Sequence, residues 1–170
     1  MTKQSNTSAI SGFSLVELMI VLVILGIISA FAMPGIKGII ENIQLYTTVN
    51  GIKRQLMCAK TRALGDSQLH CGVFFDTVGT ADKVQVFLDN GLPINNGQYD
   101  QGLDQRIMGA FYIPPTLSLS VSDIDGKCEI VFRGDGSTRV QGVTVTVNTS
   151  RNRNKKVSVV SSTGRIRVAE

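Results

Sequence analysis

The 170-residue sequence is 43% hydrophobic, 18% charged and 6% aromatic, and it contains no tryptophan. This length suits one domain plus a segment too short for a second core, and this composition excludes an intrinsically disordered chain. The formal net charge is +4, but residues 127–170 alone carry nine basic and three acidic residues. The basic character therefore belongs to the carboxyl-terminal quarter, which favours an anionic partner there.

An apolar run covers residues 13–33. Its polar members are Ser14, Glu17 and Ser29. These 21 residues, as a helix rising about 1.5 Å per residue, can cross a hydrocarbon core of about 30 Å, which excludes a purely cytosolic soluble protein. The polar segment 1–12 ends in Gly12, so cleavage after Gly12 would leave the membrane helix on the mature protein. A carboxylate inside a bilayer costs roughly 2.5–3.5 kcal/mol, so Glu17 needs a partner there. Cleavage after Gly12 would supply one, because it creates an ammonium group on Phe13. An uncleaved membrane anchor is the alternative.

The string GFSLVELMIV that begins at Gly12, followed by Met33 and Pro34, resembles the class III signal and amino-terminal helix of type IV pilins and pseudopilins. The resemblance implies that a prepilin peptidase cleaves between Gly12 and Phe13 and that Phe13 is then N-methylated. It also implies that Glu17 pairs with the Phe13 amine of an adjacent subunit during filament assembly with other major and minor pilins. The protein would span the inner membrane once, with its carboxyl-terminal domain in the periplasm, before it enters a type IV pilus.

Residues 34–65 are predicted to continue this helix, weakened by proline and glycine where it leaves the bilayer. Apolar side chains follow three- and four-residue steps: Ile39, Ile43, Tyr46, Val49, Ile52, Leu56, Ala59 and Ala63. This stripe predicts a helix face that packs on a sheet. Basic residues lie mostly off the stripe: Lys53, Arg54, Lys60 and Arg62. We interpret these cations as structural, because they complement the helix dipole, and Gly65 and Asp66 are expected to end the helix.

From residue 66 to residue 170 the hydrophobic period changes to two, which predicts a β-rich domain. Candidate strands cover residues 69–75, 84–88, 106–113, 117–121, 128–132, 140–147, 156–161 and 165–168. Residues 89–104 are rich in Asp and Asn, but their spacing does not match a calcium-binding EF-hand, so an ordinary loop is favoured. The predicted fold class is α+β and type IV pilin-like, with a long amino-terminal helix packed on an antiparallel β-sheet.

The run IVFRGDG at residues 130–136 and the ending at residues 157–168 resemble the GspH/FimT domain of minor pilins and pseudopilins. Residues 164–167, GRIR, match the GRxR motif of FimT-type minor pilins. In those proteins the motif implies DNA binding during uptake for natural transformation. GspH pseudopilins of type II secretion and FimU-type minor pilins share the domain without necessarily sharing that role.

In a strand, Arg165 and Arg167 point to one face about 6.6 Å apart, and the residues between and after them point to the other. Gly164 can adopt the positive φ that a tight turn requires. The preceding basic segment offers further cations: Arg151, Arg153, Lys155 and Lys156. Such a set would bind the phosphate backbone of double-stranded DNA without sequence preference. A solvated, cation-rich hairpin is the alternative, and the sequence does not show whether the two basic segments meet.

The sequence does not favour an enzyme. His70 is the only histidine and has no catalytic or metal-ligand pattern around it, so we predict no catalytic residues, metal or cofactor. The cysteines Cys58, Cys71 and Cys128 form no CxxC motif, and a periplasmic domain would allow one disulfide among them. Strand parity favours Cys71 with Cys128, but all three pairings remain open.

Two functions from different classes follow from these observations. The first is a minor type IV pilin that binds DNA through its basic carboxyl-terminal region. The second is a structural minor pilin, or a type II secretion pseudopilin, that primes or caps a filament without binding DNA.

Overall fold

A computed structural model describes residues 13–66, 69–79, 81–90, 98–122, 128–139 and 142–169. Its internal contacts divide the chain into two compact units, Met1–Ile40 and Glu41–Glu170. Among the described residues there is one helix, α1, which covers Leu15–Gly65 and contributes residues to both units. The predicted leader, including Gly12, lies outside the described residues.

The first unit consists, as far as it is described, of the amino-terminal part of α1. Every described side chain from residue 13 to residue 31 is exposed, so this segment buries none of its described apolar side chains within its own unit. By length and hydropathy, no uninterrupted helix among the described residues qualifies as a membrane span, whereas Leu15–Phe31 and Ile36–Gly65 qualify as a pair.

In the second unit, α1 buries one continuous stripe. Its buried apolar residues alternate in steps of four and three: Leu45, Val49, Ile52, Leu56, Ala59 and Ala63. The predicted stripe is correct from Val49 onward but wrong before it, because Ile43 and Tyr46 are exposed. The regular alternation leads back from Val49 to Leu45, and the two exposed residues belong to neighbouring faces of the helix. As predicted, α1 ends at Gly65.

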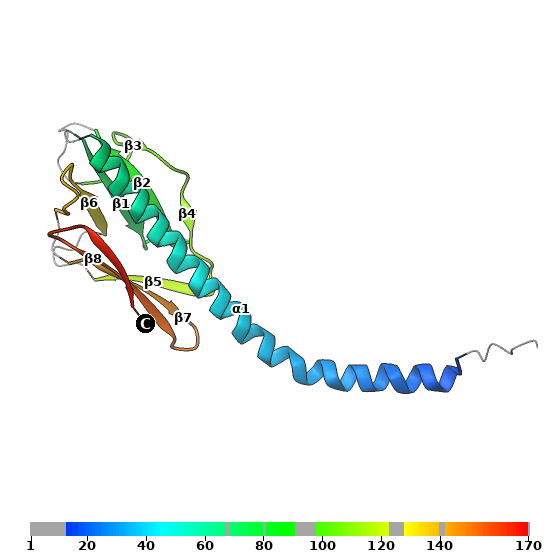
Figure 1. Cartoon of the computed structure of the whole chain (residues 1–170). Coiled ribbons are helices and arrows are strands. Elements are labelled where there is room, and N and C mark those ends of the chain that lie inside the picture. The colour runs from blue at the N-terminus through cyan, green and yellow to red at the C-terminus, as the bar shows by residue number, and fades with distance from the viewer. Residues whose placement is uncertain are drawn as a thin grey trace, which may run out of the picture. The chain divides into compact units, whose positions relative to one another are not determined.

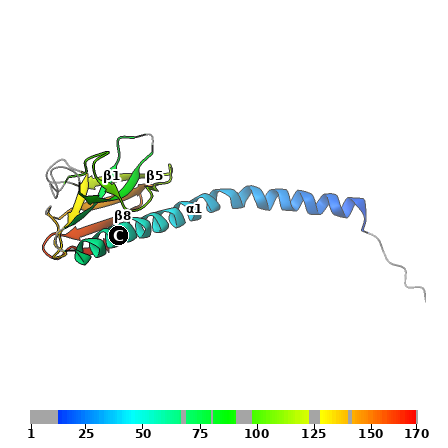
Figure 2. The same cartoon turned by 90° about the horizontal axis from the view of Figure 1, so that it is seen from above.

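The described strands form two antiparallel sheets. The five-stranded sheet has the order β3-β2-β1-β6, and β4 also pairs with β2. Its strands are β1 (His70–Asp76), β2 (Lys83–Asp89), β3 (Gln105–Arg106), β4 (Phe111–Tyr112) and β6 (Glu129–Phe132). The four-stranded sheet has the order β5-β7-β8-β9. Its strands are β5 (Leu117–Ser122), β7 (Thr144–Thr149), β8 (Asn154–Val160) and β9 (Arg165–Ala169). Within this unit, α1 runs alongside the strands (Figures 1 and 2).

The hydrophobic core joins all three layers of the second unit. Buried residues of α1 pack with those of the five-stranded sheet, such as Val73 and Ile130, and of the four-stranded sheet, such as Val145 and Val157. The α+β prediction of a long helix on antiparallel strands is therefore confirmed, and every member of the core lies in the second unit.

One predicted strand, residues 106–113, is two short strands in the structure. β3 and β4 pair with opposite ends of β2. Ile107 still donates its N–H to the carbonyl oxygen of Val86 at 3.1 Å, and the ladder is interrupted after it. There the amide Nε2 of Gln85 donates a hydrogen bond to the carbonyl oxygen of Met108 at 2.6 Å. A side chain thus replaces a backbone partner, which the alternation of apolar residues does not reveal.

Candidate nucleic-acid interface

The register of the β8–β9 hairpin determines which of the candidate cations lie on the same face of the sheet. Its antiparallel register pairs Ser158 with Arg167 and Val160 with Arg165, while Lys156 pairs with Ala169. Residues directly opposite each other point to the same side of a sheet. Lys156, Arg165 and Arg167 therefore share the outer face of the hairpin, and all three are exposed.

The inner face of the same hairpin is mostly apolar. Val157 and Val159 are buried in the core, and Ile166 packs against it while half-buried. Val168 is 43% exposed, so the predicted inward packing holds for Ile166 but not for Val168. β9 is the last strand of its sheet, which leaves the end of the inner face uncovered.

The turn before Arg165 is held in place by α1. The Nζ of Lys60 donates hydrogen bonds to the carbonyl oxygens of Thr163 at 2.8 Å and Gly164 at 3.2 Å. Gly164 has a φ of +55°, in the left-handed region that only glycine adopts without strain. A Cβ at this position would lie 2.1 Å from the carbonyl oxygen of Gly136. Gly164 thus serves packing, and the cations beside it provide the charge.

The turn against which Gly164 packs is also rigidly bonded. The backbone N–H of Thr138 donates to the carbonyl oxygen of Ser161 at 2.8 Å, which links the two turns. Asp135 accepts hydrogen bonds from the hydroxyl and the backbone N–H of Ser137 at 2.6 and 2.8 Å. The hydroxyl bond is the larger cause that holds the pKa of Asp135 below its usual value. The turn at residues 133–137 therefore keeps its negative charge near neutral pH.

The remaining candidate cations lie at the opposite end of β8, where they bind α1. Arg151 Nε lies 3.5 Å from Glu41 Oε2, and Arg153 Nη1 donates a 2.7 Å hydrogen bond to Asn42 Oδ1. Lys155 is only 8% exposed, and its Nζ lies 4.2 Å from the centre of the Tyr46 ring. Only Lys156 of this basic segment shares a face with Arg165 and Arg167. Arg151 and Arg153 precede β8 and lie roughly 20 Å from Arg165 along the strand. Figure 1 shows the β7–β8 turn and the β8–β9 turn at opposite ends of the four-stranded sheet.

The structure adds two cations that the sequence analysis assigned to the helix dipole. Lys53 and Lys60 lie on α1 beside the turn that carries Arg165, and all three line one groove. The seven-residue spacing of the two lysines, which puts them on one helix face, was the available signal. This spacing could not be interpreted without knowing that β9 begins beside that face.

The cysteine prediction is wrong for the favoured pair. Cys71 lies opposite Phe132 in β6, whereas the carbonyl of Cys128 accepts a hydrogen bond from the N–H of Phe75. Four residues of strand, or about 13 Å, thus separate the two positions, well beyond the Cα separation of about 7 Å that a disulfide can span. All three cysteines are free thiols. Burial, and to a lesser degree Cys58, raises the pKa of Cys71 to about 12, so this thiol stays protonated.

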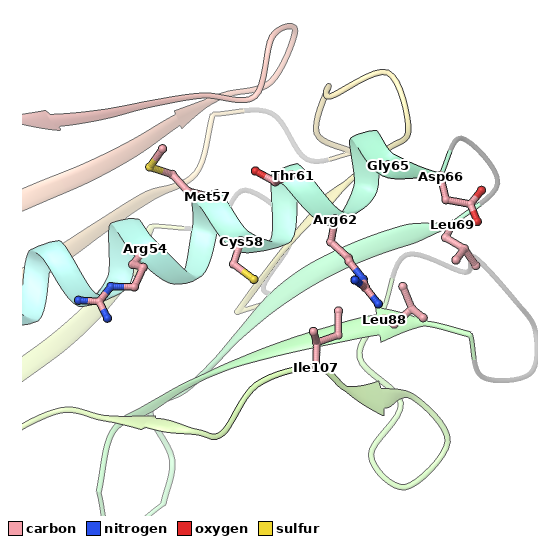
Figure 3. Close-up of a pocket in the computed structure, with 10 residues that line it drawn as sticks. All are labelled: Arg54, Met57, Cys58, Thr61, Arg62, Gly65, Asp66, Leu69, Leu88 and Ile107. Atoms are coloured by element: carbon pink, nitrogen blue, oxygen red, sulfur yellow. The ribbon is translucent and has the colours of Figure 1, made fainter.

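A cavity of about 800 Å³ lies on the neighbouring face of α1, and Met57 lines both this cavity and the groove of Lys53 and Lys60. Figure 3 shows Arg62 extending from α1 toward Leu88, with Cys58 and Ile107 nearby. The residues that line this cavity include Asp66 and Leu69, and the two residues between them lie outside the described part of the chain. We assign no ligand to this cavity.

Comparison with known proteins agrees with these observations. Residues 7–33 match the prokaryotic N-terminal methylation motif, which includes Gly12, Phe13 and Glu17. The minor pseudopilin EpsH from the type 2 secretion system of Vibrio cholerae has a similar fold, with a TM-score of 0.55 and 10% identity over 74% of this chain and 96% of EpsH. The type IV minor pilin FimU of Pseudomonas aeruginosa is similar with a TM-score of 0.55 and 12% identity, over 76% of this chain and 91% of FimU.

At these identities the two structures establish the fold, which is that of type IV pilins. The methylation motif stands at the start of the same helix that the fold requires. Motif and fold together support a minor pilin or pseudopilin.

Proposed function

We propose that this protein is a membrane-anchored minor pilin that binds the phosphate backbone of double-stranded DNA and supports DNA uptake in natural transformation. The observation that carries the proposal is the outer face of the β8–β9 hairpin, on which Lys156, Arg165 and Arg167 are exposed together. Among the described residues, no acidic side chain forms a salt bridge with any of these three. Their charge is therefore available to an external anion.

The chemistry of this face suits a phosphate backbone. Two guanidinium groups spaced about 6.6 Å apart on one strand face offer planar donor forks to successive anionic groups. Neighbouring outer positions on β7 and β8, such as Thr146 and Ser158, are hydroxyls that can donate further hydrogen bonds. The register places no aromatic ring among these positions, so contact with the backbone is favoured over base stacking.

Anchoring and assembly complete the proposal. A prepilin peptidase cleaves after Gly12, Phe13 is N-methylated, and Glu17 pairs with the amine of a neighbouring pilin in the filament. Support comes from the methylation motif at residues 7–33 and from the exposure of every described side chain from residue 13 to residue 31. An exposed apolar helix segment of this length is suited to being covered by lipid or by neighbouring subunits.

The test measures binding of duplex DNA by the full chain in a non-ionic detergent as a function of salt. One lost phosphate contact lowers the log–log salt slope by about 0.9 and the affinity by about tenfold at 50 mM salt. Replacing Arg165 and Arg167 together with Gln should therefore cost about a hundredfold and reduce the slope by about 1.8. Lys156→Gln should cost about tenfold, whereas its neighbour Lys155, buried on the other face, should tolerate the same replacement without loss of DNA affinity.

The second candidate is a structural minor pilin or pseudopilin that primes or caps a filament without binding DNA. One observation favours it: three of the predicted DNA-binding cations, Arg151, Arg153 and Lys155, already contact residues of α1. Absence of DNA binding by the parent protein at low salt would replace the first proposal with this one. Equal binding by the parent and a folded Arg165 and Arg167 double variant would contradict the assignment of the interface.

A further inference from the structure

A groove of about 430 Å³ lies where α1 passes the start of β9. Lys53, Met57 and Lys60 line it from α1, and Arg165 and Ile166 line it from β9. The side chains of Met57 and Ile166 give the groove an apolar part, and the others place cations around it. The groove lies at the edge of the four-stranded sheet, because β9 is its last strand.

The geometry of α1 keeps the two lysines of this groove on one side. Lys53, Met57 and Lys60 follow each other at four and three residues, so they share one face of the helix. Lys53 and Lys60 are about 10 Å apart along the helix axis. Lys60 is committed to the carbonyl oxygens of the β8–β9 turn, which fixes the end of the groove. Lys53 is half-buried and forms no salt bridge among the described residues.

The distribution of charge around β9 indicates on which side of this strand an anion is held. On the outer face, Lys156 in β8 lies opposite Thr146 in β7, which in turn lies opposite Ser120 in β5. Both of these neighbours are uncharged. On the α1 side of the same strand, the groove adds Lys53 and Lys60 directly beside Arg165. The positive charge next to Arg165 is thus concentrated toward α1 rather than across the sheet.

We propose that this groove binds a backbone phosphate of duplex DNA, with Lys53 as its ligand and Lys60 positioning the turn that carries Arg165. The proposal rests on the proposed function and extends it: the DNA contacts two elements, α1 and β9, instead of the hairpin alone. Met57, which is 52% exposed, and the half-buried Ile166 give this open groove an apolar wall on one side, which lowers the local dielectric constant and strengthens the attraction of the phosphate to the ammonium group. A phosphodiester suits the groove because it needs no base contact.

The experiment compares two neighbouring residues of α1 in the full chain in non-ionic detergent. Lys53→Gln should lower the affinity for duplex DNA about tenfold at 50 mM salt and reduce the log–log salt slope by about 0.9. Arg54→Gln makes the same change in net charge one residue away, but Arg54 does not line the groove; it lines the cavity on the neighbouring face of α1. This control should leave the slope unchanged. Lys53→Arg, which keeps the charge, should retain parental binding.

Each outcome decides the proposal. A loss confined to Lys53→Gln, with recovery in Lys53→Arg, supports the groove. If Lys53→Gln matches Arg54→Gln while replacement of Arg165 and Arg167 abolishes binding, the groove proposal is overturned and DNA binding by the hairpin stands. If the parent protein does not bind DNA, both proposals fail. Thermal unfolding of each variant shows whether a lost affinity comes from a lost fold.

Discussion

At the scale of the residue, the GRIR sequence at 164–167 contains two kinds of residue with different tasks. Gly164 is buried, has a φ of +55°, and lies so close to the carbonyl oxygen of Gly136 that no side chain fits. Arg165 and Arg167 are exposed and make no salt bridge among the described residues. The glycine shapes the turn, and the arginines present charge beyond it.

Replacing Gly164 with Ala should therefore act on stability and not directly on DNA contact. We expect Gly164→Ala to lower the free energy of unfolding by about 3 kcal/mol, because strain at positive φ adds to a clash with a backbone carbonyl. Gly142 is the matched control, since it has the same φ of +55° but no atom within 4 Å of an added Cβ. Gly142→Ala should cost only about 1 kcal/mol. Urea unfolding of residues 41–170, which retain the whole core, measures both values, and equal losses would show that the clash is relieved at no cost.

The sequence predicts some of these residue roles and not others. Alternation along β9 correctly places Arg165 and Arg167 on one face, because side-chain direction in a strand depends only on parity. Parity alone does not show which of Lys155 and Lys156 points into the fold, because this depends on how β8 pairs with its neighbouring strands. It also favoured the wrong cysteine pair, because parity gives the face of a residue but not its position along the partner strand.

At the scale of the element, the turn between β7 and β8 attaches the four-stranded sheet to the start of α1 in the second unit. Ser150 and Arg151 both contact Glu41, and Arg153 contacts Asn42. One turn further along the helix, the ammonium of Lys155 lies over the Tyr46 ring. The polar part of this turn thus replaces the apolar contact that Ile43 and Tyr46 were expected to make with a sheet.

Lys155 and Lys156 provide a test of this attachment, because they are the same residue type on opposite faces of β8. Lys155→Gln should lower the free energy of unfolding by about 1 kcal/mol through loss of the cation–π contact and of packing by the lysine stem. Lys156→Gln should stay within about 0.5 kcal/mol of the parent, since Lys156 is exposed. Urea unfolding of residues 41–170 measures both, and a loss for Lys156→Gln equal to that for Lys155→Gln would contradict this description of the two faces.

Most elements could be predicted because their hydrophobic period is strong. The candidate strands at 84–88, 117–121 and 165–168 each fall within one residue of β2, β5 and β9. The division into two sheets could not be predicted, because it depends on which strands pair over long separations in sequence. The pairing of β1 with β6 and of β5 with β7 joins residues far apart in the chain, and no local pattern encodes it.

At the scale of the whole molecule, the chain consists of two units with different surroundings. All core residues belong to Glu41–Glu170, whereas the described side chains of residues 13–31 are exposed and mostly apolar. The boundary between the units falls within residues 34–65, so neither the end of the apolar run at residue 33 nor the change of period at residue 66 marks it. The interface was only partly predictable, because Lys53 and Lys60 reach β9 through the tertiary fold.

The amino terminus provides the prediction at this scale. We expect the mature protein to begin with N-methylated Phe13, because the methylation motif spans residues 7–33 and cleavage creates an ammonium partner for Glu17. Mass spectrometry of the native protein checks this, and retention of residues 1–12 would contradict it. Glu17→Ala should leave membrane insertion intact while reducing incorporation into the filament, as measured by the ratio of the variant in sheared filaments to that in membranes. Unchanged incorporation would exclude a role for the ammonium pair.

The close contact of Gly164 with Gly136 bears on how this protein diverges from its relatives. A backbone approach that admits no side chain is a requirement of the fold, so it persists in every descendant that keeps these two turns. The two exposed arginines beside it have no such packing role, so they can be replaced without harm to folding. Relatives that have abandoned nucleic acid should therefore retain the glycine and vary at the two arginine positions, so that the arginines alone, and not the whole tetrapeptide, trace the history of DNA binding.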